Sequence, residues 1–164
     1  MSTAPVFTIT RTLAASKQSV FDAFSNADAL AQWWGPVEAP IDVVSLDFRP
    51  GGIFHYRMKG PQVSYGIFRY IAIHEPDSIE WVNSFANEKA EIIKAPFAGI
   101  DFPKEMLVTI HLSETDGITT LLLTSKPLHA TENETSTFVA MTSSMEQGFG
   151  GTFRQLENYL RNKN

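Results

Sequence analysis

The sequence predicts an α+β domain in which a curved antiparallel sheet wraps around a long C-terminal helix. Two observations carry this prediction. Several segments between residues 41 and 124 alternate apolar and polar side chains with the period of two that is typical of half-buried strands. The last third of the chain has a helical period instead, and it opens on a capping box formed by Thr131 and Glu134. Helices at both ends of a continuous run of strands favour a sheet of about six to seven strands that grips the terminal helix.

The elements before this run are one strand and two short helices. Val6–Leu13 alternates as a strand does. A first helix is expected over Lys17–Phe24, where the apolar side chains form one stripe. Asn26 or Asp28 can cap a second helix, which ends at Trp33–Pro36 because glycine and proline stop it there.

The sheet itself is predicted as a meander. Its strands are expected at Ile41–Phe48, Ile53–Lys59, Val63–Ile73, Ile79–Phe85, Met106–Leu112 and Ile118–Thr124. Residues 49–52 form a glycine-containing turn in which Asp47 and Arg49 can pair, and the Asp116–Gly117 turn is of the kind that hairpins favour. Residues 86–103 have no sustained period, so we expect a long functional loop and a mobile flap there.

The helix after Thr131 is predicted as one long, apolar element. Its face toward the sheet is made of Phe138, Met141, Met145, Phe149, Phe153, Leu156 and Leu160. Gly148, Gly150 and Gly151 interrupt it, and each costs about 1 kcal/mol relative to alanine inside a helix. Either close packing against a strand or a bend over a cavity can explain them.

Composition excludes several classes of function. The 164 residues fit a single domain spanning 1–164. A net charge of −5 without any Lys/Arg cluster argues against a nucleic-acid partner. There are no cysteines, no apolar run of the roughly 18 residues that a membrane span needs, and no leader-like N-terminal pattern. We therefore expect a cytoplasmic protein that does not insert into membranes.

Several motifs in order resemble the START-like (SRPBCC, helix-grip) superfamily, and within it the bacterial branch similar to the activator of Hsp90 ATPase homologue and the calicheamicin self-resistance protein. The motifs are Val20–Phe24, Trp33–Pro36, Asp47–Gly52, Trp81–Phe85, Pro103–Leu107 and Ser144–Gly151. The resemblance implies a helix-grip fold with a hydrophobic cavity under the long helix, which members of the superfamily use for lipids, hormones, polyketides and occasionally catalysis. The family usually has Trp where this chain has Phe149.

Strand parity and the helical stripe together predict the residues that line a ligand cavity. Aromatic and methionine walls suit flat, apolar ligands, although a plain core is the alternative for each member. The predicted ligand-binding residues are Trp33, Trp34, Phe54, Tyr56, Met58, Phe68, Tyr70, Trp81, Asn83, Phe85, Met106, Val108, Phe138, Met141, Met145 and Phe149.

Within this set, Tyr56, Tyr70 and Asn83 are the polar groups that a ligand oxygen or the sheet backbone can satisfy, and Asn83 is the preferred anchor. Trp33 and Trp34 stand either at the cavity mouth or over the sheet edge. The four histidines have no metal-ligand spacing, and no nucleophile elbow, phosphate loop or dinucleotide fingerprint is present. No catalytic residue, metal or cofactor is therefore predicted.

Three functions are consistent with these features. The first is a non-enzymatic protein that binds or sequesters a small hydrophobic molecule such as a lipid, a polyketide or an aromatic compound. The second is a co-chaperone-like stress-response protein, which only the resemblance suggests, and which ranks lower because the Hsp90 activator proper carries a further N-terminal domain. The third is a cyclase or dehydratase, for which the inner face offers no evident general base. The sequence leaves a homodimer open.

Overall fold

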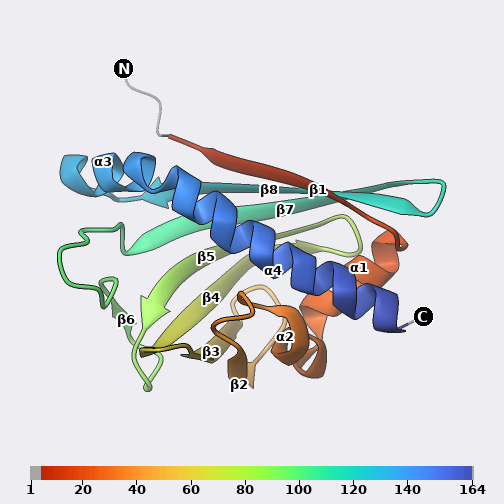
Figure 1. Cartoon of the computed structure of the whole chain (residues 1–164), viewed down its shortest axis with the longest axis horizontal. Helices are drawn as coiled ribbons and strands as arrows, with labels where there is room; N and C mark the ends of the chain where they lie inside the picture. The colour runs from red at the N-terminus through yellow and green to blue at the C-terminus, as the bar shows by residue number, and fades with distance from the viewer. Residues whose placement is uncertain (1–4, 164) are drawn as a thin grey trace.

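A computed structural model of the chain describes residues 5–163 and contains an open antiparallel sheet with all its helices on one side (Figure 1). The strands are β1 (Phe7–Leu13), β2 (Ile41–Leu46), β3 (Ile53–Lys59), β4 (Val63–His74), β5 (Ser78–Ala86), β6 (Ile92–Ile93), β7 (Glu105–Thr115) and β8 (Ile118–Leu128). The helices are α1 (Lys17–Ser25), α2 (Ala27–Trp33), α3 (Glu132–Ala140) and α4 (Thr142–Lys163). The α+β fold class predicted from the sequence is confirmed.

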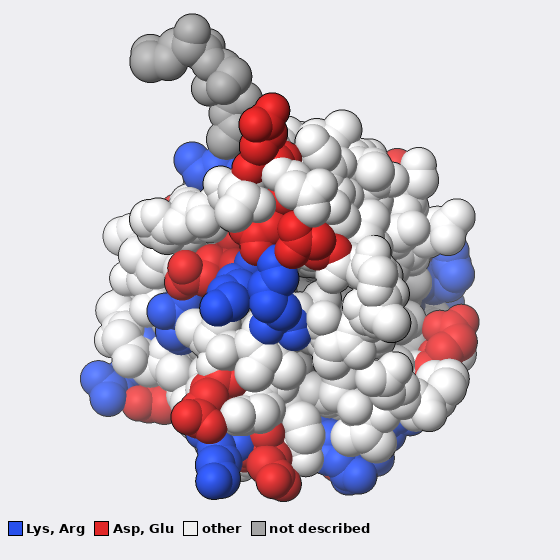
Figure 2. Space-filling view, turned by 90° about the vertical axis from the view of Figure 1, so that its left-hand side faces the viewer, with Lys and Arg blue, Asp and Glu red and all other residues white. Residues whose placement is uncertain are grey.

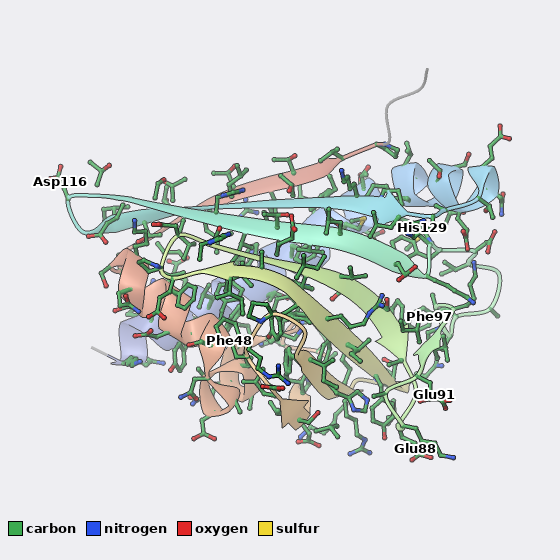
Figure 3. All side chains as sticks on the ribbon, turned by 180° about the vertical axis from the view of Figure 1, so that it is seen from behind. Phe48, Glu88, Glu91, Phe97, Asp116 and His129 are labelled. Atoms are coloured by element: carbon green, nitrogen blue, oxygen red, sulfur yellow. The ribbon has the colours of Figure 1, made fainter. Side chains whose placement is uncertain are left out.

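The sheet has the strand order β1-β8-β7-β5-β4-β3-β2, and the short β6 adds to β5. Neighbouring strands are antiparallel throughout. The α4 helix crosses the concave face diagonally, whereas no helix within residues 5–163 covers the opposite face (Figures 1 and 3). The apolar inner positions of the strands and of α4 therefore meet in one layer between sheet and helix.

Local sequence signals set the helix boundaries as expected. The side chains of Ser16 and Asn26 accept hydrogen bonds from the first turns of α1 and α2. Thr131 and Glu134 form the predicted capping box at the start of α3. At the end of α2, Trp33 Nε1 donates to the carbonyl oxygen of Ala23 over 2.9 Å, and Gly35 takes a φ of +90° that a side chain would disfavour.

The predicted long C-terminal helix is confirmed in α4, but the helical pattern after Thr131 forms two elements rather than one. The helix divides at Met141, whose backbone (φ −99°, ψ 8°) leaves the α-helical range between α3 and α4. The glycines do not mark a break, because α4 continues through them. A Cβ on Gly150 would lie 3.3 Å from Arg11 Nη2, and one on Gly151 would lie 3.8 Å from Pro36. Of the two, Gly150 fits the close-packing explanation, whereas 3.8 Å at Gly151 is an ordinary van der Waals distance that an alanine could also adopt.

The segment between β5 and β7 closes one end of the molecule. It carries β6, and Phe97 packs edge-on against Phe85 with ring centroids 5.6 Å apart (Figure 3). Lys94 contacts both Asp101, at 2.5 Å, and Glu134 at the start of α3. Figure 2 faces this end of the molecule and shows basic side chains bordered by acidic ones. The expected long loop therefore packs against the sheet through Phe97 and forms an ion pair with α3 through Lys94.

Aromatic rings fill the core beneath the helices. Phe68 stacks on Trp81 with centroids 4.4 Å apart and an interplanar angle of 13°. Trp34 and Phe54 each meet Phe68 edge-on, at 5.1 and 5.0 Å. This packing occupies much of the space that the fold encloses. Over residues 5–163, no helix is both long and apolar enough to span a membrane.

Candidate functional site: an apolar pocket under the first half of α4

One pocket of about 290 Å³ lies between the inner face of the sheet and the first half of α4. The α2–β2 connection, strands β3, β4 and β5, and α4 contribute its wall. The lining residues are Trp34, Gly35, Pro36, Tyr56, Met58, Gly66, Asn83, Ser84, Phe85, Met145, Gly148, Phe149 and Thr152. None of them carries a charged side chain, and the wall is predominantly aromatic or aliphatic.

The pocket exists because α4 is packed unevenly along its length. Beyond the pocket, Phe153, Leu156 and Leu160 are buried against the core. By contrast, none of residues 139–151 is buried, although Met145 and Phe149 pack against the core from its edge. The first half of α4 therefore covers the inner face of the sheet without filling the space between helix and sheet.

The structure separates the predicted ligand-binding residues into two groups. Those on the pocket wall are Trp34, Tyr56, Met58, Asn83, Phe85, Met145 and Phe149. Those outside it are Trp33, Phe54, Phe68, Tyr70, Trp81, Met106, Val108, Phe138 and Met141. Members of the second group pack in or against the aromatic core. Strand parity finds the inner face of the sheet, but it does not show which part of that face other side chains already fill.

Tyr56 reaches its place on the wall by lying over a glycine of the next strand. In the sheet, Tyr56 of β3 pairs with Gly66 of β4, which in turn pairs with Phe85 of β5. A Cβ built on Gly66 would lie only 2.3 Å from both Cζ and Oη of Tyr56. The phenol therefore occupies the space that any other residue at position 66 would take, and its hydroxyl lies over β4.

Burial keeps the two inner tyrosines protonated. It raises the pKa of the Tyr56 phenol to about 12, and hydrogen bonding with Trp34 opposes this shift. Burial also raises the pKa of Tyr70, and the nearby Tyr56 adds to that effect. Tyr56 is only 5% exposed yet lines the pocket, so its hydroxyl is a neutral polar group on an apolar wall.

Asn83, Ser84 and Thr152 are the further polar residues on the wall. Asn83 projects from β5, and its amide can both donate and accept. Thr152 faces the pocket from α4 and is 4% exposed. An apolar cavity with a few polar groups is the usual composition of a small-molecule site.

Sequence reasoning did not predict six of the lining positions as ligand-binding residues. They are Gly35, Pro36, Gly66, Ser84, Gly148 and Thr152. Gly66 carried a usable signal, since glycine inside a strand pattern often marks a close approach by another group. Ser84 carried none, because its parity places it on the outer face of β5.

A sheet that grips a long helix around an apolar pocket defines a helix-grip protein of the START-like class. The chain belongs to the family described as activator of Hsp90 ATPase homolog 1-like protein, whose model matches residues 14–161. This confirms the superfamily and the branch that the sequence motifs suggested. No curated protein matches the sequence of the chain.

Solved structures of bacterial proteins share the fold. A protein from Arthrobacter aurescens is 24% identical with a TM-score of 0.80, covering 97% of this chain and 87% of its own. A protein from Mycobacterium smegmatis is 25% identical with a TM-score of 0.77, and the coverage is 97% and 92%. The AHSA1 protein from Silicibacter pomeroyi is 20% identical with a TM-score of 0.74, and the coverage is 98% and 100%.

Proposed function

We propose that the chain binds a small, uncharged and mainly apolar molecule in the pocket under α4, without transforming it chemically. The single observation that carries the proposal is the pocket wall, which combines aromatic and methionine side chains with no charged residue. Burial of apolar ligand surface supplies about 25 cal/mol per Å². A charged ligand would lose its hydration without gaining an ionic partner.

The absence of acid–base groups on this wall favours binding over catalysis. No carboxylate or histidine lines the pocket among residues 5–163, and the pKa of Tyr56, about 12, keeps its phenol from acting as a base near neutral pH. A cyclase or dehydratase therefore gains no support from the site. Membership in the family does not assign chaperone stimulation to this chain, because one fold serves many functions.

A matched pair of fluorescent probes tests the proposal. N-phenyl-1-naphthylamine is uncharged, and 8-anilinonaphthalene-1-sulfonate is the same scaffold with a sulfonate. We expect the uncharged probe to bind at micromolar concentration and the sulfonate to bind at least tenfold more weakly. No binding of the uncharged probe, or tighter binding of the sulfonate, would contradict the proposal.

A pair of methionine substitutions in α4 locates the bound probe. A Cβ on Gly148 meets no atom within 4 Å, so Gly148→Met can extend into the pocket without displacing a neighbour. Ser144→Met adds the same side chain at an exposed position of the same helix. We expect probe binding to be lost in Gly148→Met and retained in Ser144→Met. Equal binding by both variants would place the probe elsewhere.

A further inference from the structure

The arrangement of Tyr56 and Trp34 leaves one hydroxyl proton free to face the pocket. The ring of Trp34 lies edge-on to that of Tyr56 with centroids 6.3 Å apart, and hydrogen bonding from Trp34 lowers the pKa of the Tyr56 phenol against the larger effect of burial. An indole has an N–H donor and no acceptor, so Trp34 can only donate to the phenol oxygen. The Tyr56 proton must then find its acceptor elsewhere.

Gly66 determines where the Tyr56 hydroxyl lies. Because the phenol lies over Gly66, its hydroxyl sits above β4, next to β5 and its inner residues Asn83 and Phe85. The side chain of Phe85 has no polar atom, and among residues 5–163 no hydrogen bond joins the Tyr56 hydroxyl to the Asn83 amide, which also faces the pocket. The Tyr56 hydroxyl and the Asn83 amide are thus neighbouring polar groups on a predominantly apolar wall.

From this geometry we infer that the bound molecule is an uncharged carbonyl compound, such as a ketone, ester or amide, whose oxygen accepts the hydroxyl proton of Tyr56. The inference rests on the proposed function and specifies its ligand class. A carbonyl oxygen has two lone pairs, so it can also accept from the Asn83 amide.

Alternative ligand groups fit this wall less well. A pure hydrocarbon would bury the Tyr56 hydroxyl without an acceptor, which costs the desolvation of that group. A carboxylate would accept the proton but would bring a charge into a pocket with no basic residue on its wall. The carbonyl satisfies the donor and adds no charge.

Three naphthalenes of similar size test the ligand class: 2-acetylnaphthalene, 2-ethylnaphthalene and 2-naphthoate. Their affinities are measured by displacement of N-phenyl-1-naphthylamine from the folded chain. We expect the ketone to bind about fivefold tighter than the hydrocarbon, which is the effect of about one net hydrogen bond. We expect the carboxylate to bind most weakly.

Substitution of Tyr56 assigns the effect to its hydroxyl. Tyr56→Phe should abolish the preference for the ketone over 2-ethylnaphthalene, because the hydrocarbon then no longer buries an unsatisfied hydroxyl. Tyr65→Phe is the matched control, because Tyr65 lies one position before Gly66 and its ring faces His55 on the outer side of the sheet. Gly66→Ala, which moves the ring of Tyr56 and keeps its hydroxyl, should also reduce the preference.

The outcomes separate this inference from the proposed function. If the hydrocarbon binds wild type as tightly as the ketone, or if Tyr56→Phe retains the ketone preference, the carbonyl inference fails and the proposed function stands. If the probe binds but neither the ketone nor the hydrocarbon displaces it, the carbonyl inference also fails. If the probe itself does not bind, the proposed function fails. Near-ultraviolet circular dichroism of each variant confirms that the aromatic core is intact.

Discussion

The ring of Phe149 in α4 stacks on the ring of Phe7 in β1, with centroids 5.7 Å apart and planes inclined by 23°. Phe149 also stacks on Phe153 at 6.1 Å, which connects the pocket wall to the buried half of α4. These contacts pack the first half of α4, which borders the pocket, against the edge strand β1. The size of the side chain at position 149 should therefore control how much space the pocket offers.

Phe149→Trp should narrow the pocket, because the larger indole occupies space that the phenyl ring leaves free. We expect the affinity for N-phenyl-1-naphthylamine to fall at least tenfold, since small steric changes in an apolar site are worth about 1–3 kcal/mol. Fluorescence titration measures the change. Phe149→Leu is the companion variant, which should retain binding of the same probe. An unchanged affinity for N-phenyl-1-naphthylamine in Phe149→Trp would mean that the probe binds outside this pocket.

Gly66→Ala should destabilise the fold, because the new Cβ would lie 2.3 Å from the ring of Tyr56. Overpacking of this kind typically costs about 1–3 kcal/mol in the free energy of unfolding. Urea denaturation measures it. The cost should be smaller when Gly66→Ala is combined with Tyr56→Leu, which removes the ring. An equal cost in both backgrounds would show that Tyr56 is not the neighbour in conflict.

Gly148→Ala should stabilise the protein, because Gly148 is inside α4 and its Cβ would meet no atom within 4 Å. Replacing glycine by alanine in a helix interior gains about 0.5–1 kcal/mol. Gly150→Ala should gain less, since its Cβ would lie 3.3 Å from Arg11 Nη2. Thermal unfolding of the two variants side by side measures the difference. A loss of stability in Gly148→Ala would indicate that a bend at this glycine matters.

The contact between Lys94 and Glu134 should make stability depend on pH at the acidic end. Hydrogen bonding from Lys94, followed by that from the Thr131 backbone, lowers the pKa of Glu134 below its ordinary value of 4.5. A carboxyl group with a lowered pKa stabilises the folded state above its unfolded pKa, and this contribution is lost as the pH falls through the folded pKa. The melting temperature should therefore fall as the pH drops below 4.5.

Glu134→Gln should flatten this acidic decrease, since the amide cannot be protonated in this range. The control is Glu157→Gln, which removes an exposed carboxylate of α4 paired with Arg161. We expect the control to follow the wild-type profile between pH 7 and pH 3. If Glu134→Gln shows the same decrease as wild type, other carboxyl groups govern the acid sensitivity.

The order of the elements could be predicted because it depends on local sequence. The alternation of apolar and polar residues predicted the strands of the meander. The capping residues Ser16, Asn26 and Thr131 each accept a hydrogen bond from an amide in the first turn of the helix that follows. The pairing of Asp47 with Arg49, at 2.8 Å, was likewise predicted because the two residues are neighbours in one turn. The break at Met141 was missed, since the apolar stripe continues across it without a proline or glycine at that position.

The candidate site depended on longer-range packing. The sequence by itself determined the inner faces of the strands and of α4, and it placed aromatic and methionine side chains there, because side-chain parity is a local property of each element. Only the tertiary structure decided which of those side chains fill the core and which border a pocket. The stacking of Phe68 on Trp81 closes one region, while the phenol of Tyr56 over Gly66 shapes another. Both contacts join residues of different strands, so their effect on volume exists only once the strands are paired.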